Sequence, residues 1–130
     1  MADHPNVETL RRVYAAFMAG DMDTVSALFD DGIRWHNAGN SPLSGDFVGK
    51  QDVFAHFQRL GELTKGSLAF DIHTILADDE HGVVLVERTQ EQPSPYRGRE
   101  VHMWHLRDGL ATESWTFRED QAAFDAAVSA

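Results

Sequence analysis

The spacing of apolar residues changes along the chain and divides it into two parts. Up to residue 60, apolar side chains recur every three or four positions, which is the period of helices with one buried face. From residue 67 onward apolar and polar residues alternate, as they do in half-buried strands. The pattern predicts helices over residues 6–19, 22–29 and 50–60, and then strands over residues 67–77, 82–92, 99–106 and 110–117. A last short helix is predicted from Asp120 to Val128.

Capping and turn residues set the expected boundaries of these elements. Residues that favour helix ends border the predicted helices. Asn6 and Asp21 are expected N-caps, and Gly20 and Gly61 are expected to end the first and third helices. The Asp-Asp-Gly sequence at residues 30–32 should end the second helix, and a short strand should follow over residues 33–37. The glycines and the proline of residues 39–45 predict a loop.

Helices followed by antiparallel strands define an α+β fold. We expect one domain over residues 1–130, in which a curved, mostly antiparallel sheet forms a cone-shaped barrel and the N-terminal helices pack on its concave face. Cysteine is absent, which excludes disulfides and thiolate metal sites. The net charge of −10 argues against a nucleic-acid partner, because phosphate binding needs a basic face. Neither a membrane span nor a secretory signal is present, so a cytoplasmic location is expected.

The last predicted hairpin determines which side chains share the inner face of the sheet. A three-residue loop over residues 107–109, with Gly109 in the left-handed region, pairs His102 with Ser114. The inner face then carries large apolar groups, small hydroxyls and one imidazole, a composition typical of a ligand pocket. A two-residue turn would shift the register by one and pair His102 with Trp115. We favour the first arrangement.

The opposite face of the same hairpin gathers large apolar groups, namely Met103, Trp115 and Phe117. Such a patch is typical of a subunit interface. The sequence therefore predicts a homodimer that is formed through this outer face.

Four segments carry a resemblance to a known superfamily: AGDMDTVSALFDDGIRWH, LSGDFVGKQDVFAHF, EVHMWHLRDGLATESWTF and EDQAAFDA. In the order of its predicted elements and in the turn residues between them, the chain resembles the nuclear transport factor 2-like superfamily. Within that superfamily it resembles the ketosteroid isomerase-like and SnoaL-like polyketide cyclase proteins. The likeness covers nearly the whole chain. It implies the conical α+β fold, but this scaffold hosts isomerases, cyclases, epoxide hydrolases, dehydratases and non-catalytic binders.

The resemblance places two histidines at positions that carry chemistry in the family. His36 falls where the isomerases have their carboxylate base, and His102 falls where they have an oxyanion-hole acid and where the polyketide cyclases have a histidine. Those cyclases also carry an acidic base directly after the tryptophan of the last strand, where this chain has Thr116. The isomerases supply a tyrosine from the first helix, and its nearest counterpart by spacing is Val13, with Tyr14 one step away.

We therefore expect His36 and His102 to face each other as catalytic groups across an apolar pocket. The expected substrate-binding side chains are aromatic or carry a hydroxyl: Tyr14, Trp35, Phe57, Trp104 and Thr116. One imidazole could accept a proton while the other donates to a developing oxyanion, which suits proton abstraction beside a carbonyl of an apolar or cyclic compound. This chemistry needs no cofactor. The histidines lack the spacing of metal ligands, and only one of Glu87 and Arg88 can face inward.

Three functions fit this pocket. The first is a small-molecule enzyme that works by proton transfer, such as an isomerase, a cyclase or a dehydratase. The second is a non-catalytic binding protein for an apolar metabolite, which the threonine at position 116 and the poor match of the helix tyrosine favour. The third is a structural or dimerisation module whose pocket is filled by its own side chains. We favour the first.

Overall fold

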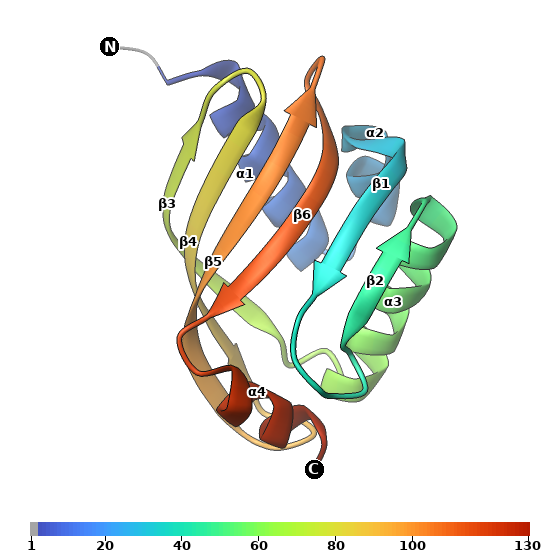
Figure 1. Ribbon diagram of the computed structural model, residues 1–130, viewed down its shortest axis with the longest axis vertical. Coiled ribbons are helices and arrows are strands. Elements are labelled where there is room, and N and C mark those ends of the chain that lie inside the picture. The colour runs from blue at the N-terminus through green and yellow to red at the C-terminus, as the bar shows by residue number, and fades with distance from the viewer. Residues whose placement is uncertain (1–2) are drawn as a thin grey trace.

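The computed structural model describes residues 3–130 and has the predicted α+β architecture (Figure 1). The helices are α1 (Pro5–Met18), α2 (Met22–Leu28), α3 (Lys50–Thr64) and α4 (Gln121–Val128). The strands are β1 (Phe29–Asn37), β2 (Gly45–Val48), β3 (Ala69–Ala77), β4 (His81–Gln90), β5 (Tyr96–Arg107) and β6 (Leu110–Arg118). They form one sheet in the order β2-β1-β6-β5-β4-β3, in which β1 and β6 run parallel and the other neighbours are antiparallel. β2 and β3 are its two edges, so the cone is an open one.

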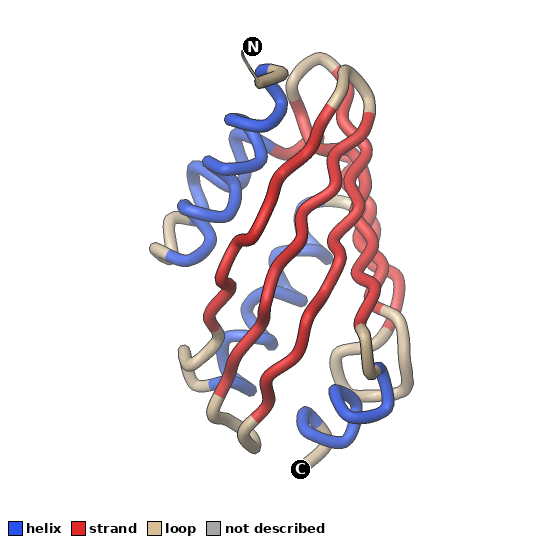
Figure 2. Tube along the Cα trace, turned by 90° about the vertical axis from the view of Figure 1, so that its left-hand side faces the viewer, coloured by secondary structure: helices blue, strands red, loops and turns tan. Residues whose placement is uncertain are grey.

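The helices cover one face and one end of the curved sheet. α1, α2 and α3 lie on the same side of it, and α4 lies at the end where the chain terminates (Figures 1 and 2). The main core lies between these helices and the inner face of the sheet, where Leu10, Val25, Ile33 and Trp104 are almost completely buried. A smaller cluster around Phe124 joins α4 to the rest. Within residues 3–130, no helix is both long and apolar enough to cross a lipid bilayer.

Side chains cap the N-termini of α1, α2 and α4, whereas α3 has no side-chain cap among the described residues. Contrary to prediction, the N-cap of α1 is His4, whose Nδ1 accepts a hydrogen bond from the N–H of Asn6 at 3.0 Å. The Asn6 side chain instead donates to the carbonyl of Asp78 at 3.0 Å, which ties α1 to the turn between β3 and β4. The predicted cap of α2 is confirmed, because the Asp21 carboxylate accepts from the N–H of Thr24 at 3.2 Å.

α3 is one turn longer than predicted. It continues through Gly61 to Thr64, whose side chain is buried and whose hydroxyl donates to the carbonyl of Leu60 at 2.8 Å. The helix ends only where Lys65 and then Gly66 adopt left-handed backbone conformations, with φ of 50° and 73°. Packing of the last turn therefore overrides the low helix propensity of Gly61.

The Asp-Asp-Gly sequence at residues 30–32, which was expected to precede the first strand, lies within that strand. α2 ends at Leu28 and β1 starts at once, with Phe29 opposite Ala111 of β6 and Arg34 opposite Glu113. More residues of β1 than of β6 lie between these two pairs, so the Asp-Asp-Gly sequence forms an irregular bulge within the strand. β2 was not predicted, because a four-residue edge strand is too short to show alternation.

The register of the last hairpin differs from the predicted one. The turn has two residues, Asp108 and Gly109, both with positive φ, and a bulge at Thr112 of β6 adds one more shift. His102 therefore pairs with Thr116, two positions beyond the predicted Ser114. Because side chains alternate with a period of two, this shift leaves both hydroxyl residues on the inner face with His102.

Two glycine substitutions test how tightly the core is packed. A Cβ on Gly82 would lie 2.4 Å from a methyl carbon of Leu10, whereas a Cβ on Gly61 would meet nothing within 4 Å. We expect Gly82→Ala to lower the free energy of unfolding by about 1–3 kcal/mol through overpacking. Gly61→Ala should raise it by about 0.5–1 kcal/mol, because it restricts the unfolded chain and favours the helix. Urea unfolding of both variants measures this, and equal effects would contradict the packing described here.

Candidate active site

An apolar pocket lies between the inner face of the sheet and the helices. Its walls are aromatic: the Trp35 ring lies 4.9 Å from the ring of Phe57 and 5.4 Å from that of Trp104, nearly perpendicular to both. Tyr14 of α1 and Thr116 of β6 also line it. The five residues expected to bind substrate thus all border this pocket, and their role in binding stays a prediction.

The volume of the pocket limits what it can hold without rearrangement. The cavity has a volume of about 50 Å³. A single water needs roughly 10–15 Å³ by this measure, so there is room for a few waters or a very small molecule. A ring compound requires the lining side chains to move.

A buried chain of hydrogen bonds forms one wall of the pocket. Tyr14 Oη lies 2.5 Å from His102 Nδ1, and His102 Nε2 lies 2.8 Å from a carboxylate oxygen of Glu100. The indole N–H of Trp104 donates to Tyr14 Oη at 3.2 Å. Since that oxygen already accepts from Trp104, its own hydrogen can point to His102 Nδ1, and the Nε2–H of His102 then donates to Glu100.

Burial and charge set the ionisation of the two ends of this chain. Burial raises the pKa of Tyr14 far above its usual value, so its hydroxyl stays protonated. Burial alone would also raise the pKa of Glu100, but the hydrogen bond from His102 and two nearby guanidinium groups outweigh it and lower the pKa to about 2. Glu100 is therefore a carboxylate at neutral pH, and it can orient the imidazole and stabilise its charged form.

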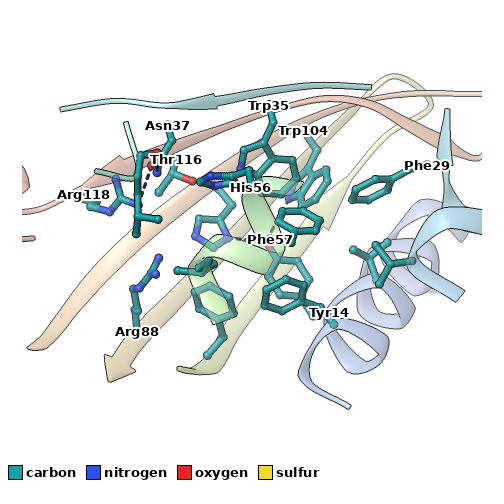
Figure 3. Close-up of a pocket in the computed structure, with 17 residues that line it drawn as sticks. Tyr14, Phe29, Trp35, Asn37, His56, Phe57, Arg88, Trp104, Thr116 and Arg118 are labelled. Carbon is teal, nitrogen blue, oxygen red and sulfur yellow. Dashed lines mark hydrogen bonds between the residues drawn. The ribbon is translucent and has the colours of Figure 1, made fainter. Parts of the chain in front are cut away.

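The two guanidinium groups belong to Arg118 of β6 and Arg88 of β4, and both are buried. Arg118 Nε donates to Glu100 at 2.9 Å, while the nearest nitrogen of Arg88 lies 3.7 Å from the same carboxylate oxygen. Both guanidinium groups stack on the Phe124 ring, with carbon-to-centroid distances of 3.7 Å for Arg118 and 4.8 Å for Arg88. Figure 3 shows the two arginines at one end of the pocket and Phe29 near the other. The pocket therefore has a charged end and an aromatic end.

Of the neighbours Glu87 and Arg88, it is Arg88 that faces inward. Glu87 lies on the other face of β4 and pairs with Arg97 at 2.9 Å. Burial lowers the pKa of Arg88 to about 10, which still leaves it protonated at neutral pH. Its Nε donates to Gln90 at 3.0 Å, whereas its Nη2 has no hydrogen-bond partner among residues 3–130.

A third histidine, His56 of α3, also lines the pocket. Its ring stacks on Phe47 with a centroid distance of 4.3 Å, and its buried Nδ1 lacks a partner within the described part of the chain. Burial, followed by the positive charges of nearby arginines, lowers the pKa of His56 to about 4. The ring is therefore neutral at pH 7, and Nδ1 can either donate or accept according to its tautomer.

His36 lies outside the pocket, so the expectation that it faces His102 is wrong. Its ring stacks on Trp115 at 5.2 Å on the outer face of the sheet, with Nδ1 2.6 Å from Asp46 and Nε2 2.6 Å from Glu113. The reason is the alternation of a strand: Trp35 points inward, so its neighbour must point outward. The partner of His102 in the pocket is Tyr14, not His36.

Several residues of this site were not identified from the sequence: Glu100, Arg118, His56 and Asn37. Asn37 accepts a hydrogen bond from Arg118 at 3.0 Å and thereby joins β1 to the charged end. The period of two along β5 puts Glu100 on the same face as His102, and this signal could have found the carboxylate. The period of two along β6 also joins Arg118 to Thr116. His56 lies three residues after Val53 and four before Leu60, so the helical period places it on the buried face of α3 and could have found it.

The open cone with a pocket under its sheet defines the nuclear transport factor 2-like class of proteins, and residues 10–114 match the sequence model of the SnoaL-like domain. The chain belongs to the SnoaL-like family within that superfamily. Bal32a, from a soil-derived mobile gene cassette, shares 31% identity with a TM-score of 0.89, over 94% of this chain and 95% of its own.

Two more solved structures share the fold at lower identity. A protein from Jannaschia sp. CCS1 assigned to the SnoaL-like polyketide cyclases has a TM-score of 0.82 at 22% identity, and covers 100% of this chain and 98% of its own. A nuclear transport factor 2-like protein of unknown function from Burkholderia pseudomallei has a TM-score of 0.84 at 23% identity, covering 96% and 98%. At these identities the likeness establishes the fold alone.

The position of His36 makes a pH-dependent prediction. Burial alone would lower its pKa, but the hydrogen bonds to Asp46 and Glu113 outweigh burial and raise it. A raised pKa in the folded state means that the stabilisation is complete below pH 6.5 and is lost as the pH rises through the folded-state value. We expect His36→Gln to lower the free energy of unfolding by about 0.5–1 kcal/mol at pH 6 and by much less at pH 9.

Urea unfolding at the two pH values measures this difference. Asp46→Asn is the matched control, because it removes one partner and should reduce the pH dependence without abolishing it. A His36→Gln effect of the same size at both pH values would contradict the assigned ion pairs.

Proposed function

We propose that this protein is a small-molecule enzyme that transfers a proton on a carbonyl compound bound in the pocket. The observation that carries the proposal is the chain from Tyr14 through His102 to Glu100, which is buried in the wall of an otherwise aromatic cavity. It combines a base, a carboxylate that orients it and a neutral hydroxyl donor. Membership of a family that includes polyketide cyclases supports the same kind of chemistry.

The proposed step uses Tyr14 and His102 in turn. In the free protein the Tyr14 hydroxyl donates to His102 Nδ1. A bound carbonyl oxygen competes for this hydroxyl, and when the hydrogen turns to the substrate, Nδ1 is left with a free lone pair. It then takes a proton from the carbon beside the carbonyl, and the electron pair of the broken C–H bond forms an enolate whose oxygen accepts from Tyr14.

Glu100 supports the charged form of the imidazole during this step. The imidazolium keeps its Nε2–H directed at the carboxylate, so the new positive charge forms beside a fixed negative one. Returning the proton to a different carbon completes an isomerisation. Attack of the enolate on a second carbonyl carbon closes a ring, and the oxygen of that carbonyl takes the proton back from His102. The same site thus serves an isomerase or a cyclase, and the cofactor-independent mechanism uses only groups of the protein.

Hydrogen–deuterium exchange tests the proton abstraction without knowledge of the natural substrate. In D₂O, enolisable cyclic ketones incubated with the protein should gain deuterium beside the carbonyl, as read by proton NMR. We expect His102→Ala to reduce the exchange rate by about 10²–10⁴-fold, because general-base assistance is lost. Tyr14→Phe should reduce it as well, since the hydroxyl donor is removed.

His36→Ala is the matched control, because it removes an imidazole from the other face of the same sheet. It should exchange at the wild-type rate. Melting temperatures of all three variants establish that they are folded. Unchanged exchange in His102→Ala, or an equal loss in His36→Ala, would refute the assignment.

A second function, ligand retention without turnover, is favoured by two observations. Both ring nitrogens of His102 already have partners within the protein, and the cavity of about 50 Å³ leaves little room for a reacting molecule to displace them. In this case a compound co-purifies with the protein, native mass spectrometry finds its mass unchanged, and no enolisable ketone exchanges. The small volume also agrees with a purely structural role, but buried polar atoms without partners argue against a cavity that is filled for stability alone.

We also propose that the outer face of β5 and β6 forms a homodimer. Met103 lies opposite Trp115 there, and the neighbouring Phe117 exposes 52% of its surface. An exposed aromatic side chain beside other apolar groups is typical of the centre of an interface.

Sedimentation velocity at micromolar concentration tests the dimer. We expect twice the 14.5 kDa mass for the wild type and a monomer for Phe117→Arg, because a charge would be buried without a partner. Met18→Arg is the control, since Met18 is another exposed apolar residue, at the end of α1. A monomeric wild type would end the proposal.

A further inference from the structure

The charged end of the pocket contains more positive than negative charge. Two guanidinium groups, those of Arg88 and Arg118, share the carboxylate of Glu100, and all three side chains are at most 5% exposed. His56 and Tyr14 nearby are neutral at pH 7. The buried cluster therefore carries a net positive charge, in a protein whose overall charge is −10. A buried charge without a counter-charge is costly, so this end favours a ligand that supplies one.

Arg88, which lines the pocket, keeps one buried donor without a partner among residues 3–130. Glu100 lies nearest to Nη1 of Arg88 and Gln90 accepts from Nε, which leaves Nη2 without a partner in residues 3–130. Arg88 lines the cavity, whereas Glu100 lies behind the wall and does not reach the ligand space. Figure 3 shows Arg88 and Arg118 side by side at this end. A ligand there meets guanidinium nitrogens before it meets the carboxylate.

A second buried atom without a partner lies on the same cavity. His56 comes from α3, opposite the strands that carry the arginines, and its Nδ1 can supply a hydrogen once a ligand oxygen is present. Arg88 and His56 thus offer two donors from different elements. Two donors beside a net positive charge match the two oxygens of a carboxylate.

We propose that the pocket binds a small organic monoanion whose carboxylate contacts Arg88 Nη2 and His56 Nδ1. The apolar part of this ligand then lies along the aromatic walls, toward Tyr14 and His102. This inference rests on the proposed function in that it names the substrate class of the same site: a carboxylic acid that bears an enolisable carbonyl near its apolar part. The anion-binding end itself does not depend on turnover.

Binding of a matched pair of probes tests this subsite. Propionate and propionamide have nearly the same size and differ in charge, and both are small enough for the cavity. At constant ionic strength, NMR titration of the wild-type protein should give an affinity for propionate at least about tenfold higher than for propionamide, as expected for a charge-assisted hydrogen bond in a buried site. The shifted resonances should include that of the His56 ring.

Two arginine variants test which residue causes the preference for propionate over propionamide. Arg88→Met should bring the two affinities to within about twofold, because the guanidinium is replaced by an apolar chain of similar length. Arg97→Met removes the same charge from an exposed position and should keep the preference. Tyr14→Phe should also keep it while losing hydrogen exchange, so that failure of the subsite and failure of the proton-transfer chemistry are separate results.

Three results would overturn the inference: equal affinities in the wild type, no binding of either probe, or a preference that survives in Arg88→Met. Should Arg88→Met fail to fold, a crystal structure of the wild-type protein with 4-bromobutyrate replaces it. The bromine locates the ligand by anomalous scattering, and its carboxylate must lie within hydrogen-bond distance of Arg88 Nη2. A ligand found only at the surface would equally reject the subsite.

Discussion

One buried carboxylate organises the polar part of this protein. Removing Glu100 from water costs several kcal/mol unless partners offset the loss, and here the partners are the imidazole of His102 and the guanidinium groups of Arg118 and Arg88. The same contacts fix the partners in return. His102 is held with its Nδ1 toward Tyr14, and the arginines are held at one end of the cavity. Because β4, β5 and β6 are neighbours in the sheet, this polar cluster is built on adjacent strands, which hold side chains more precisely than loops do.

The pocket joins two environments that ordinarily exclude each other. Trp35, Phe57 and Trp104 give it apolar walls in which electrostatic interactions are strong, and the charged end uses that low dielectric. A ligand with an apolar body and a single negative charge satisfies both at once. Burial also keeps Tyr14 protonated and His56 uncharged, so Tyr14 supplies no negative charge that would compete with a ligand for the arginines.

The fold was largely predictable, because the apolar residues change from a helical period to alternation between the two halves of the chain. The aromatic walls of the pocket were predictable as well, because Trp35, Phe57 and Trp104 lie on the apolar faces of their predicted elements. The register was less predictable, since bulges in β1 and β6 leave no signature in the alternation, and β2 was missed because it has only four residues. The prediction that His36 faces His102 failed for a local reason. Trp35 and His36 are neighbours on one strand, so they cannot both face inward. The charged cluster was not predicted, because charged residues on strands are ordinarily exposed. Only the three-dimensional pairing of Glu100 with Arg118 shows that these two side chains are buried.

The last helix has a role that its size does not suggest. Phe124 of α4 lies 3.7 Å from the guanidinium carbon of Arg118 and 4.8 Å from that of Arg88, so this eight-residue segment separates the charged end of the cavity from solvent. Short elements near chain ends open at low free-energy cost compared with central strands. Each opening would admit water to the arginines and weaken the electric field that they exert on a ligand. The field that acts on a ligand therefore depends on the docking of α4 as well as on the strands that carry the arginines.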